Sequence, residues 1–223
     1  MTTSPARVRQ AAPRVAETPP GRSARKRQAI LDAARSAFLA RGFDRSSMDE
    51  IADLASASKP TVYKHFETKE RLFAEAVTAE IAAAASNTEA MVTTLPSTQD
   101  LAADLRALAR QHLADLMQPD LLQMRRRLIA EAERFPELAA TWYSSGPDKA
   151  HRTLADVFSA LAAQGLLRIG DPLVAAEQFN WLVLIPVNRA MFIPGKTTRA
   201  ALNRAADRAV EAFLAAYGTQ PTQ

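Results

Sequence analysis

The 223-residue chain contains no cysteine and no long apolar run. The lack of cysteine excludes disulfides, thiolate metal sites and a cysteine nucleophile. It fits a reducing compartment, so we expect a cytoplasmic protein. No run of uncharged apolar residues approaches the roughly 18 that cross a membrane, and no apolar segment follows the N-terminal arginines. We therefore expect neither a membrane span nor a signal peptide.

Signatures of catalysis are also missing. The chain has no glycine-rich phosphate loop and no nucleophile elbow, and its carboxylates are scattered. His112 and His151 have no companion residues at a metal-ligand spacing, and we expect both at the surface. The sequence thus predicts no catalytic residue, no bound metal, no cofactor and a protein that is not an enzyme.

Positive charge is concentrated near the N-terminus. Residues 1–71 hold 14 Lys and Arg against 8 Asp and Glu, whereas residues 72–223 hold 14 against 16. A basic head on a slightly acidic body suggests that the head meets a polyanion. A soluble surface with a basic tail is the competing interpretation.

Apolar residues recur with helical spacing along almost the whole chain, and no alternating run indicates a strand. The exception is segment 1–21, whose composition predicts a disordered basic arm rich in proline. We predict an all-α fold of about ten helices, with a helix-turn-helix domain at 22–77 and a larger helical domain at 78–223. Prolines and glycines place the helices of the larger domain at about 97–117, 120–134, 137–145, 147–164, 172–194 and 198–217.

The first predicted helix, residues 22–41, ends at Gly42. A left-handed glycine there would let Phe43 return to Phe38. The helix begins with a basic cluster that can reach phosphates or a minor groove, or can be a solvated tail: Arg22, Arg25, Lys26 and Arg27.

Two short helices separated by small residues come next. Ser47 and Glu50 form a capping box at the start of one, and Ser58 caps the other. The second helix has Pro60 in its first turn and carries several side chains that can donate to phosphates. This pattern predicts a helix-turn-helix whose second helix enters the major groove of DNA.

Residues 25–77 resemble the DNA-binding domain of the TetR/AcrR family. The resemblance is long and without gaps, and it includes Ile30-Leu31, Gly42-Phe43, Ile51-Ala52, Val62-Tyr63, His65-Phe66, Lys69-Glu70 and Leu72-Phe73. It implies phosphate contacts from Ser47, Tyr63, His65 and Lys69, and contacts near the bases from Lys59, Pro60, Thr61 and Lys64. For His65, a hydrogen bond between helices is the competing interpretation. Six such contacts would give log K a slope of about −5 or −6 against log salt concentration.

The turn departs from the family pattern. The family usually has Ala-Gly-Val there, whereas this chain has Ala55-Ser56-Ala57. A left-handed serine costs on the order of 1 kcal/mol, so we expect a slightly less stable turn in the same fold.

Residues 125–183 resemble the C-terminal domain of AefR-like members of the same family. Shared features are Ala130-Glu131, the Arg134-to-Leu138 corner, Gly146-Pro147, Gly165 and Ala176-to-Phe179. The resemblance implies a ligand cavity and a four-helix bundle that pairs two subunits. Independently, segment 172–194 is apolar on nearly all sides, and a partner subunit would cover one of them. The dimer interface we expect comprises Leu154, Val157, Leu161, Val183, Val187 and Met191.

Apolar and aromatic residues on the central helices are candidates for lining the ligand cavity, although ordinary core is the competing interpretation. They are Met117, Leu121, Met124, Leu128, Trp142, Tyr143, Phe158 and Phe179. The run Arg125-Arg126-Arg127 could direct one guanidinium toward an acidic ligand, or all three could be solvated or paired with carboxylates such as Glu131.

These patterns together predict a homodimeric repressor. It would bind a palindromic operator in double-stranded DNA and be released by a small apolar or amphipathic effector. One alternative is a DNA-binding regulator without a small ligand, controlled by a protein partner or by abundance. Another is a ligand carrier or enzyme on the same fold.

Overall fold

The computed structural model describes residues 21–193 and 195–219, apart from the side chains of residues 80–89. Residues 1–20, which hold nearly all of the predicted disordered arm, lie outside the described residues. Within the described ranges the regular structure is helical, with one isolated bridge between Leu167 and Gly218. The prediction of an all-α fold is confirmed.

Eleven α-helices make up the described part of the chain, one more than the approximate number predicted. They are α1 (Arg22–Arg45), α2 (Met48–Leu54), α3 (Lys59–Phe66), α4 (Lys69–Thr94), α5 (Leu101–Leu116), α6 (Pro119–Glu131), α7 (Pro136–Ser145), α8 (Pro147–Ala163), α9 (Pro172–Val183), α10 (Ile185–Phe192) and α11 (Arg199–Tyr217). A 3-10 turn, η1 (Leu95–Ser97), follows α4.

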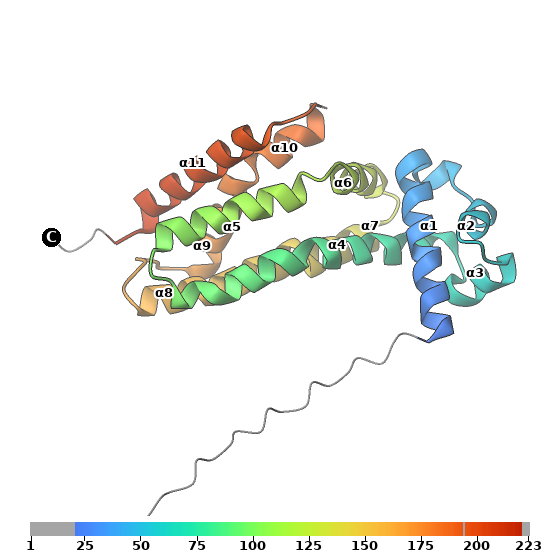
Figure 1. Cartoon of the computed structure of the whole chain (residues 1–223), viewed down its shortest axis with the longest axis horizontal. Coiled ribbons are helices and arrows are strands. Elements are labelled where there is room, and N and C mark those ends of the chain that lie inside the picture. The colour runs from blue at the N-terminus through green and yellow to red at the C-terminus, as the bar shows by residue number, and fades with distance from the viewer. Residues whose placement is uncertain (1–20, 194, 220–223) are drawn as a thin grey trace, which may run out of the picture.

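The helices form a small group at one end of an elongated body. Figure 1 shows α1, α2 and α3 gathered at that end, with α5 and α8 to α11 forming the rest of the molecule. Helix α4 starts beside α1 and continues along the body next to α5 and α8. The predicted boundary between residues 77 and 78 therefore falls inside one continuous helix.

The N-terminal group has its own apolar core. Phe38, Phe43 and Phe73 form an aromatic cluster, with ring centroids 5.0 to 6.1 Å apart. Met124 and Leu128 of α6 are buried in the same core, although α6 lies more than 40 residues further along the chain. Helix α6 thus belongs to the packing of the N-terminal group as well as to the C-terminal body.

A second core fills the C-terminal body. Phe158 of α8, Phe179 of α9 and Phe213 of α11 meet with ring centroids 5.0 to 5.7 Å apart. All three rings are almost completely buried. They join the consecutive helices α8 and α9 to α11 further along the chain, so this aromatic contact fixes how the three helices pack.

The predicted helix at 172–194 is interrupted. Helix α9 ends at Val183 and α10 begins at Ile185, with Pro186 in its first turn. A proline inside a helix lacks the N–H donor and clashes with the carbonyl four residues earlier, so the chain must start a new helix there. The apolar pattern hid this break because it continues through both helices.

At the predicted end of the first helix, Gly42 and the two phenylalanines behave as expected, but the helix continues beyond them. Gly42 has φ of 80°, and the Phe38 and Phe43 rings stack at 6.1 Å, as expected. Its ψ of 176° makes a kink, after which the helix resumes to Arg45. The backbone at this kink is one that residues with a Cβ rarely adopt.

Candidate nucleic-acid interface

Hydrogen bonds at the ends of α2 and in the turn before α3 fix the two short helices relative to each other. The Ser47 hydroxyl accepts the Glu50 N–H at 3.1 Å, which caps α2 as predicted. At the other end of α2, Ala57 N–H donates to the Ala52 carbonyl at 2.9 Å, and Ser56 has φ of 48°. This bond across a left-handed residue is the Schellman ending of a helix, and it is made here with serine in the position that favours glycine.

Helix α3 is divided into a buried face and an exposed face. The Ser58 hydroxyl accepts the Thr61 N–H at 3.4 Å and caps the helix. Val62 and Phe66 are completely buried and anchor α3 on the N-terminal core. The opposite face exposes Lys59, Pro60, Tyr63 and Lys64, all of them predicted to meet DNA. The polar side chains of this face are therefore available at the surface while the helix itself is held firmly.

The two lysines of this face differ in their partners. Lys59 forms an ion pair with Asp49 of α2, and the hydrogen bond to that carboxylate raises the pKa of the lysine. Within the described ranges, Lys64 has no such partner and stands exposed. Lys64 therefore presents its charge on this face, whereas the charge of Lys59 is already paired with a carboxylate.

Lys69 is a predicted phosphate contact with a second set of bonds. Its ammonium group donates to the carbonyls of Phe43 and Ser46 at 3.0 and 3.1 Å. It also lies 4.3 Å from the centre of the Phe43 ring. These contacts tie the first turn of α4 to the corner between α1 and α2, so in this structure Lys69 fastens the domain together.

The basic cluster at the start of α1 is helical from Arg22 onward. Arg27 forms an ion pair with Glu75 of α4 and lies 5.1 Å over the Phe66 ring. Arg22 and Arg25 are exposed on the first turn. Arg27 therefore holds α1, α3 and α4 together, and Arg22, Arg25 and Lys26 are exposed on the turn before it.

The remaining predicted contacts lie at the edges of the exposed face. Thr61 shares a hydrogen bond of 2.7 Å with the Ser58 hydroxyl. His65 is half-buried, with its ring 6.2 Å from that of Phe66. Neither Thr61 nor His65 is hydrogen-bonded to another helix in the part of the chain that the structure describes.

The residues predicted to line a ligand cavity are not brought together. Met124 and Leu128 are in the N-terminal core, and Trp142 packs against it, while Phe158 and Phe179 fill the C-terminal core. Tyr143 is 46% exposed, and Leu121 is half-buried on α6. The apolar spacing could not separate these environments, because helix α6 faces both cores and α7 packs against the N-terminal one.

A cavity of about 1010 Å³ lies instead between α5, α6 and the segment that leads into α11. Among the predicted ligand residues, Met117 lines it. Its wall also includes Leu122 and Leu202, and four basic side chains: Arg126, Arg127, Lys196 and Arg199. The last two were missed because nothing in the sequence relates the segment before α11 to α6.

Two histidines lie inside the C-terminal body, so the expectation that they sit at the surface was wrong. Asn180 of α9 links them, accepting from Nε2 of His112 at 3.2 Å and donating to Nε2 of His151 at 2.8 Å. An amide oxygen can only accept and an amide nitrogen can only donate, so the bonds fix both tautomers. Burial lowers the pKa of His112 to about 4 and also lowers the pKa of His151.

The side chains predicted for the dimer interface also pack within this protomer. Leu154, Val157, Leu161, Val183 and Val187 are at most 8% exposed, and Met191 is partly buried against the same core. They contribute to the packing of the single chain, and their place in a dimer interface stays a prediction.

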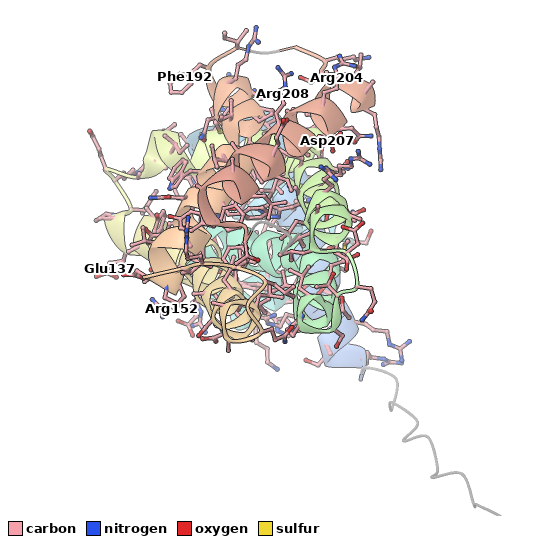
Figure 2. All side chains as sticks on the ribbon, turned by 90° about the vertical axis from the view of Figure 1, so that its left-hand side faces the viewer. Glu137, Arg152, Phe192, Arg204, Asp207 and Arg208 are labelled. Carbon is pink, nitrogen blue, oxygen red and sulfur yellow. The ribbon has the colours of Figure 1, made fainter. Side chains whose placement is uncertain are left out.

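Other apolar side chains on α9 and α10 are exposed. Trp181 is 51%, Ile185 62% and Phe192 85% exposed. Figure 2 shows Phe192 pointing away from the body at its margin. Val174 precedes Trp181 by seven residues, so the two lie on the same face of α9. We call Val174, Trp181, Ile185 and Phe192 the α9–α10 apolar surface.

Two other expectations concern membranes and metals. None of the helices in the described residues combines the length and the apolar character needed to cross a membrane. In the same residues, no group of three or more His, Asp or Glu side chains could hold a metal ion.

Comparison with known proteins agrees with the geometry of α2 and α3. The family model for bacterial regulatory proteins of the tetR family matches residues 30–76, and that for the AefR-like transcriptional repressor C-terminal domain matches residues 103–219. A TetR-family transcriptional regulator from Mesorhizobium loti MAFF303099 is 42% identical, over 90% of this chain and 100% of that chain, with a TM-score of 0.86.

Two further relatives are a regulator and an activator. The flavonoid-responsive regulator FrrA is 32% identical, over 88% of this chain and 99% of its own, with a TM-score of 0.68. The HTH-type transcriptional activator FasR of Mycolicibacterium smegmatis is 46% identical over 48 residues, a match that spans only 22% of either protein. The chain therefore belongs to the TetR family of transcriptional regulators and carries an AefR-like C-terminal domain.

Proposed function

We propose that this TetR-family regulator is a repressor that binds a palindromic operator as a homodimer, with α3 of each subunit in a major groove. The observation that carries the proposal is the division of α3, whose buried face anchors it while its other face exposes Pro60, Tyr63 and Lys64. A helix held in this way can present side chains to base edges without rearrangement.

The DNA contacts we propose differ from those expected from the sequence at two residues, Arg27 and Lys69. Ser47, Tyr63 and His65 contact phosphates, and Lys59, Pro60, Thr61 and Lys64 lie near the bases. Arg22 and Arg25 extend the basic surface. Arg27 and Lys69 act indirectly, since their bonds to Glu75 and to the carbonyls near Gly42 hold the domain in shape.

A second copy of the chain is the partner we propose for the α9–α10 apolar surface. A palindromic operator requires a two-fold partner, and an isologous contact uses the same surface on both subunits. Ile185→Glu is expected to convert dimers to monomers in light scattering. Ile129→Glu, a change at a residue of α6 that is 61% exposed, is the matched control and keeps the dimer.

Control by a small apolar or amphipathic molecule is the mode of regulation we favour. The chain is similar to a flavonoid-responsive regulator over most of its length, and it contains a cavity between α5, α6 and α11. An effector that changes operator affinity by about 1–3 kcal/mol would give a useful response.

A second candidate is a DNA-binding regulator without a small ligand, controlled by a partner protein or by abundance. The close packing of Phe158, Phe179 and Phe213 favours it, since this part of the body holds filled core where a ligand site was expected.

Selection of binding sites from random DNA by the purified full chain tests the proposal. Recovery of a palindromic site, and loss of that binding in Tyr63→Ala, is the expected result. Recovery of no site, or unchanged binding in Tyr63→Ala, would contradict the role of α3. Titration of the selected site with small molecules then separates the two candidates.

A further inference from the structure

The cavity between α5, α6 and α11 carries positive charge that the protein itself does not neutralise. Arg126, Arg127, Lys196 and Arg199 line it, and no Asp or Glu does. In the described part of the chain, none of these four forms an ion pair with a carboxylate. The guanidinium of Arg126 instead donates to the carbonyls of Ala190 and Met191 at the end of α10.

The rest of the wall is apolar. Met117, which follows α5, Leu122 of α6 and Leu202 of α11 contribute side chains. Gln118 and Gln123 add amides that can donate or accept. A volume of about 1010 Å³ is ample for a small organic molecule. An apolar wall with an excess of cations suits an acid with an apolar body, because the guanidinium fork pairs with carboxylates in a bidentate way.

Two of the lining residues also touch the DNA-binding part of the molecule. Nε2 of Gln123 donates to the carbonyl of Leu39 in α1 at 2.7 Å. The Arg127 guanidinium lies against Gly42, with its Nη1 3.1 Å from the place that a Cβ on this glycine would take. Both contacts fall at the kink of α1, which connects to the corner that Lys69 fastens.

We propose that this cavity binds an amphipathic carboxylate, and that the bound acid draws Arg127 and Gln123 away from α1 and so lowers operator affinity. The inference rests on the proposed function and names the chemical class of its effector. The coupling has a short path, because Met124 and Leu128 on the same helix are part of the N-terminal core. A displacement of α6 therefore moves groups on which α1 packs.

Calorimetry on the full chain without DNA tests the site. The probes are decanoate and naphthalene-2-carboxylate, each compared with its neutral primary amide. We expect the acids to bind about tenfold more tightly than the amides, as one charge-assisted pair would give. We expect Arg127→Gln, which removes the guanidinium that the bound acid draws away from α1, to remove that preference, and the double change Lys196→Gln with Arg199→Gln to weaken it. The control is Arg152→Gln, a matched change on α8 outside the cavity, which should keep the preference for the acid. Figure 2 shows Arg152 apart from Arg204 and Arg208 of α11.

Equal binding of acid and amide, or a preference that survives Arg127→Gln, would overturn the proposed site. Because this experiment contains no DNA, its result is independent of whether the operator assignment is right.

Operator affinity at saturating naphthalene-2-carboxylate tests the coupling. We expect a fall of about fivefold or more in the wild type. Tight binding of the acid with no change in operator affinity would overturn the proposed link through α6.

Discussion

The two cores of this protein differ in the side chains that lie in and beside them. The N-terminal core is apolar, with three phenylalanines in contact, and the chemistry of that region lies on its surface along α3. The C-terminal core has its own phenylalanine cluster, and beside it lie the buried His151 and the partly buried His112 and Asn180, joined by hydrogen bonds. The apolar N-terminal core is suited to holding a surface helix rigidly. The C-terminal core, with polar groups beside it, can respond to a bound molecule or to protonation.

The comparison also shows that α6 is shared. Its apolar residues Met124 and Leu128 belong to the N-terminal core, while Leu122 belongs to the C-terminal one. A helix that packs in two cores transmits a displacement from one to the other, because close-packed interiors do not absorb it.

The largest effect should come from breaking the N-terminal core. Phe38→Ala removes a completely buried ring that contacts both Phe43 and Phe73. We expect a loss of about 3–5 kcal/mol in unfolding free energy, measured by denaturant titration. Tyr143→Ala is the control, since this side chain is 46% exposed, and should change stability far less. Similar losses in both variants would show that the aromatic cluster is not what holds this region.

Acid should reveal the buried polar groups of the C-terminal body. The pKa of His112 is about 4 when folded and about 6.5 when unfolded, so the unfolded chain binds the proton first as pH falls. The stabilisation is complete above about pH 6.5 and declines by about 2–3 kcal/mol as the pH falls to about 4. His112→Gln should flatten this part of the stability curve. Parallel curves for wild type and variant would contradict the assignment.

The fastening role of Lys69 predicts a smaller loss. Lys69→Met removes two charge-assisted hydrogen bonds to backbone carbonyls, and we expect a loss of about 2 kcal/mol in unfolding free energy. Lys64→Met, on the exposed face of α3, is the matched control and should stay within about 0.5 kcal/mol. If the two variants were equally stable, the bonds of Lys69 would not be important for the fold.

The smallest effect we expect is a gain in unfolding free energy from a change in the turn before α3. Ser56 has φ of 48°, a conformation that glycine adopts without strain. Ser56→Gly should therefore raise the unfolding free energy by about 0.5–1 kcal/mol, and Ser56→Ala, which keeps a Cβ, should not. A loss of stability in the glycine variant would mean that the serine side chain contributes something else to the turn.

Local chemistry made the N-terminal part predictable. The capping residues Ser47 and Ser58, the strained Ser56 and the contact of Phe38 with Phe43 could be foreseen because each depends on a few neighbouring residues. Family resemblance added the surface residues that we propose to contact DNA.

Long-range packing was not predictable in the same way. Lys69 has the sequence signature of a phosphate contact and yet bonds to carbonyls more than 20 residues away. Met124 and Val187 each lie in an apolar stripe of the sequence, and only the tertiary structure shows which core each one joins. Apolar spacing identifies a buried face but not its partner.

Salt dependence of operator binding, for wild type and Lys64→Ala on the selected palindromic site, tests the central claim most directly. A slope of log K against log salt near −5 or −6 is predicted for wild type, and Lys64→Ala, which removes one lysine from each of the two subunits, should reduce its magnitude by about two. A shallow slope in the wild type, or an unchanged slope in Lys64→Ala, would contradict the assignment of α3 as the helix that meets DNA.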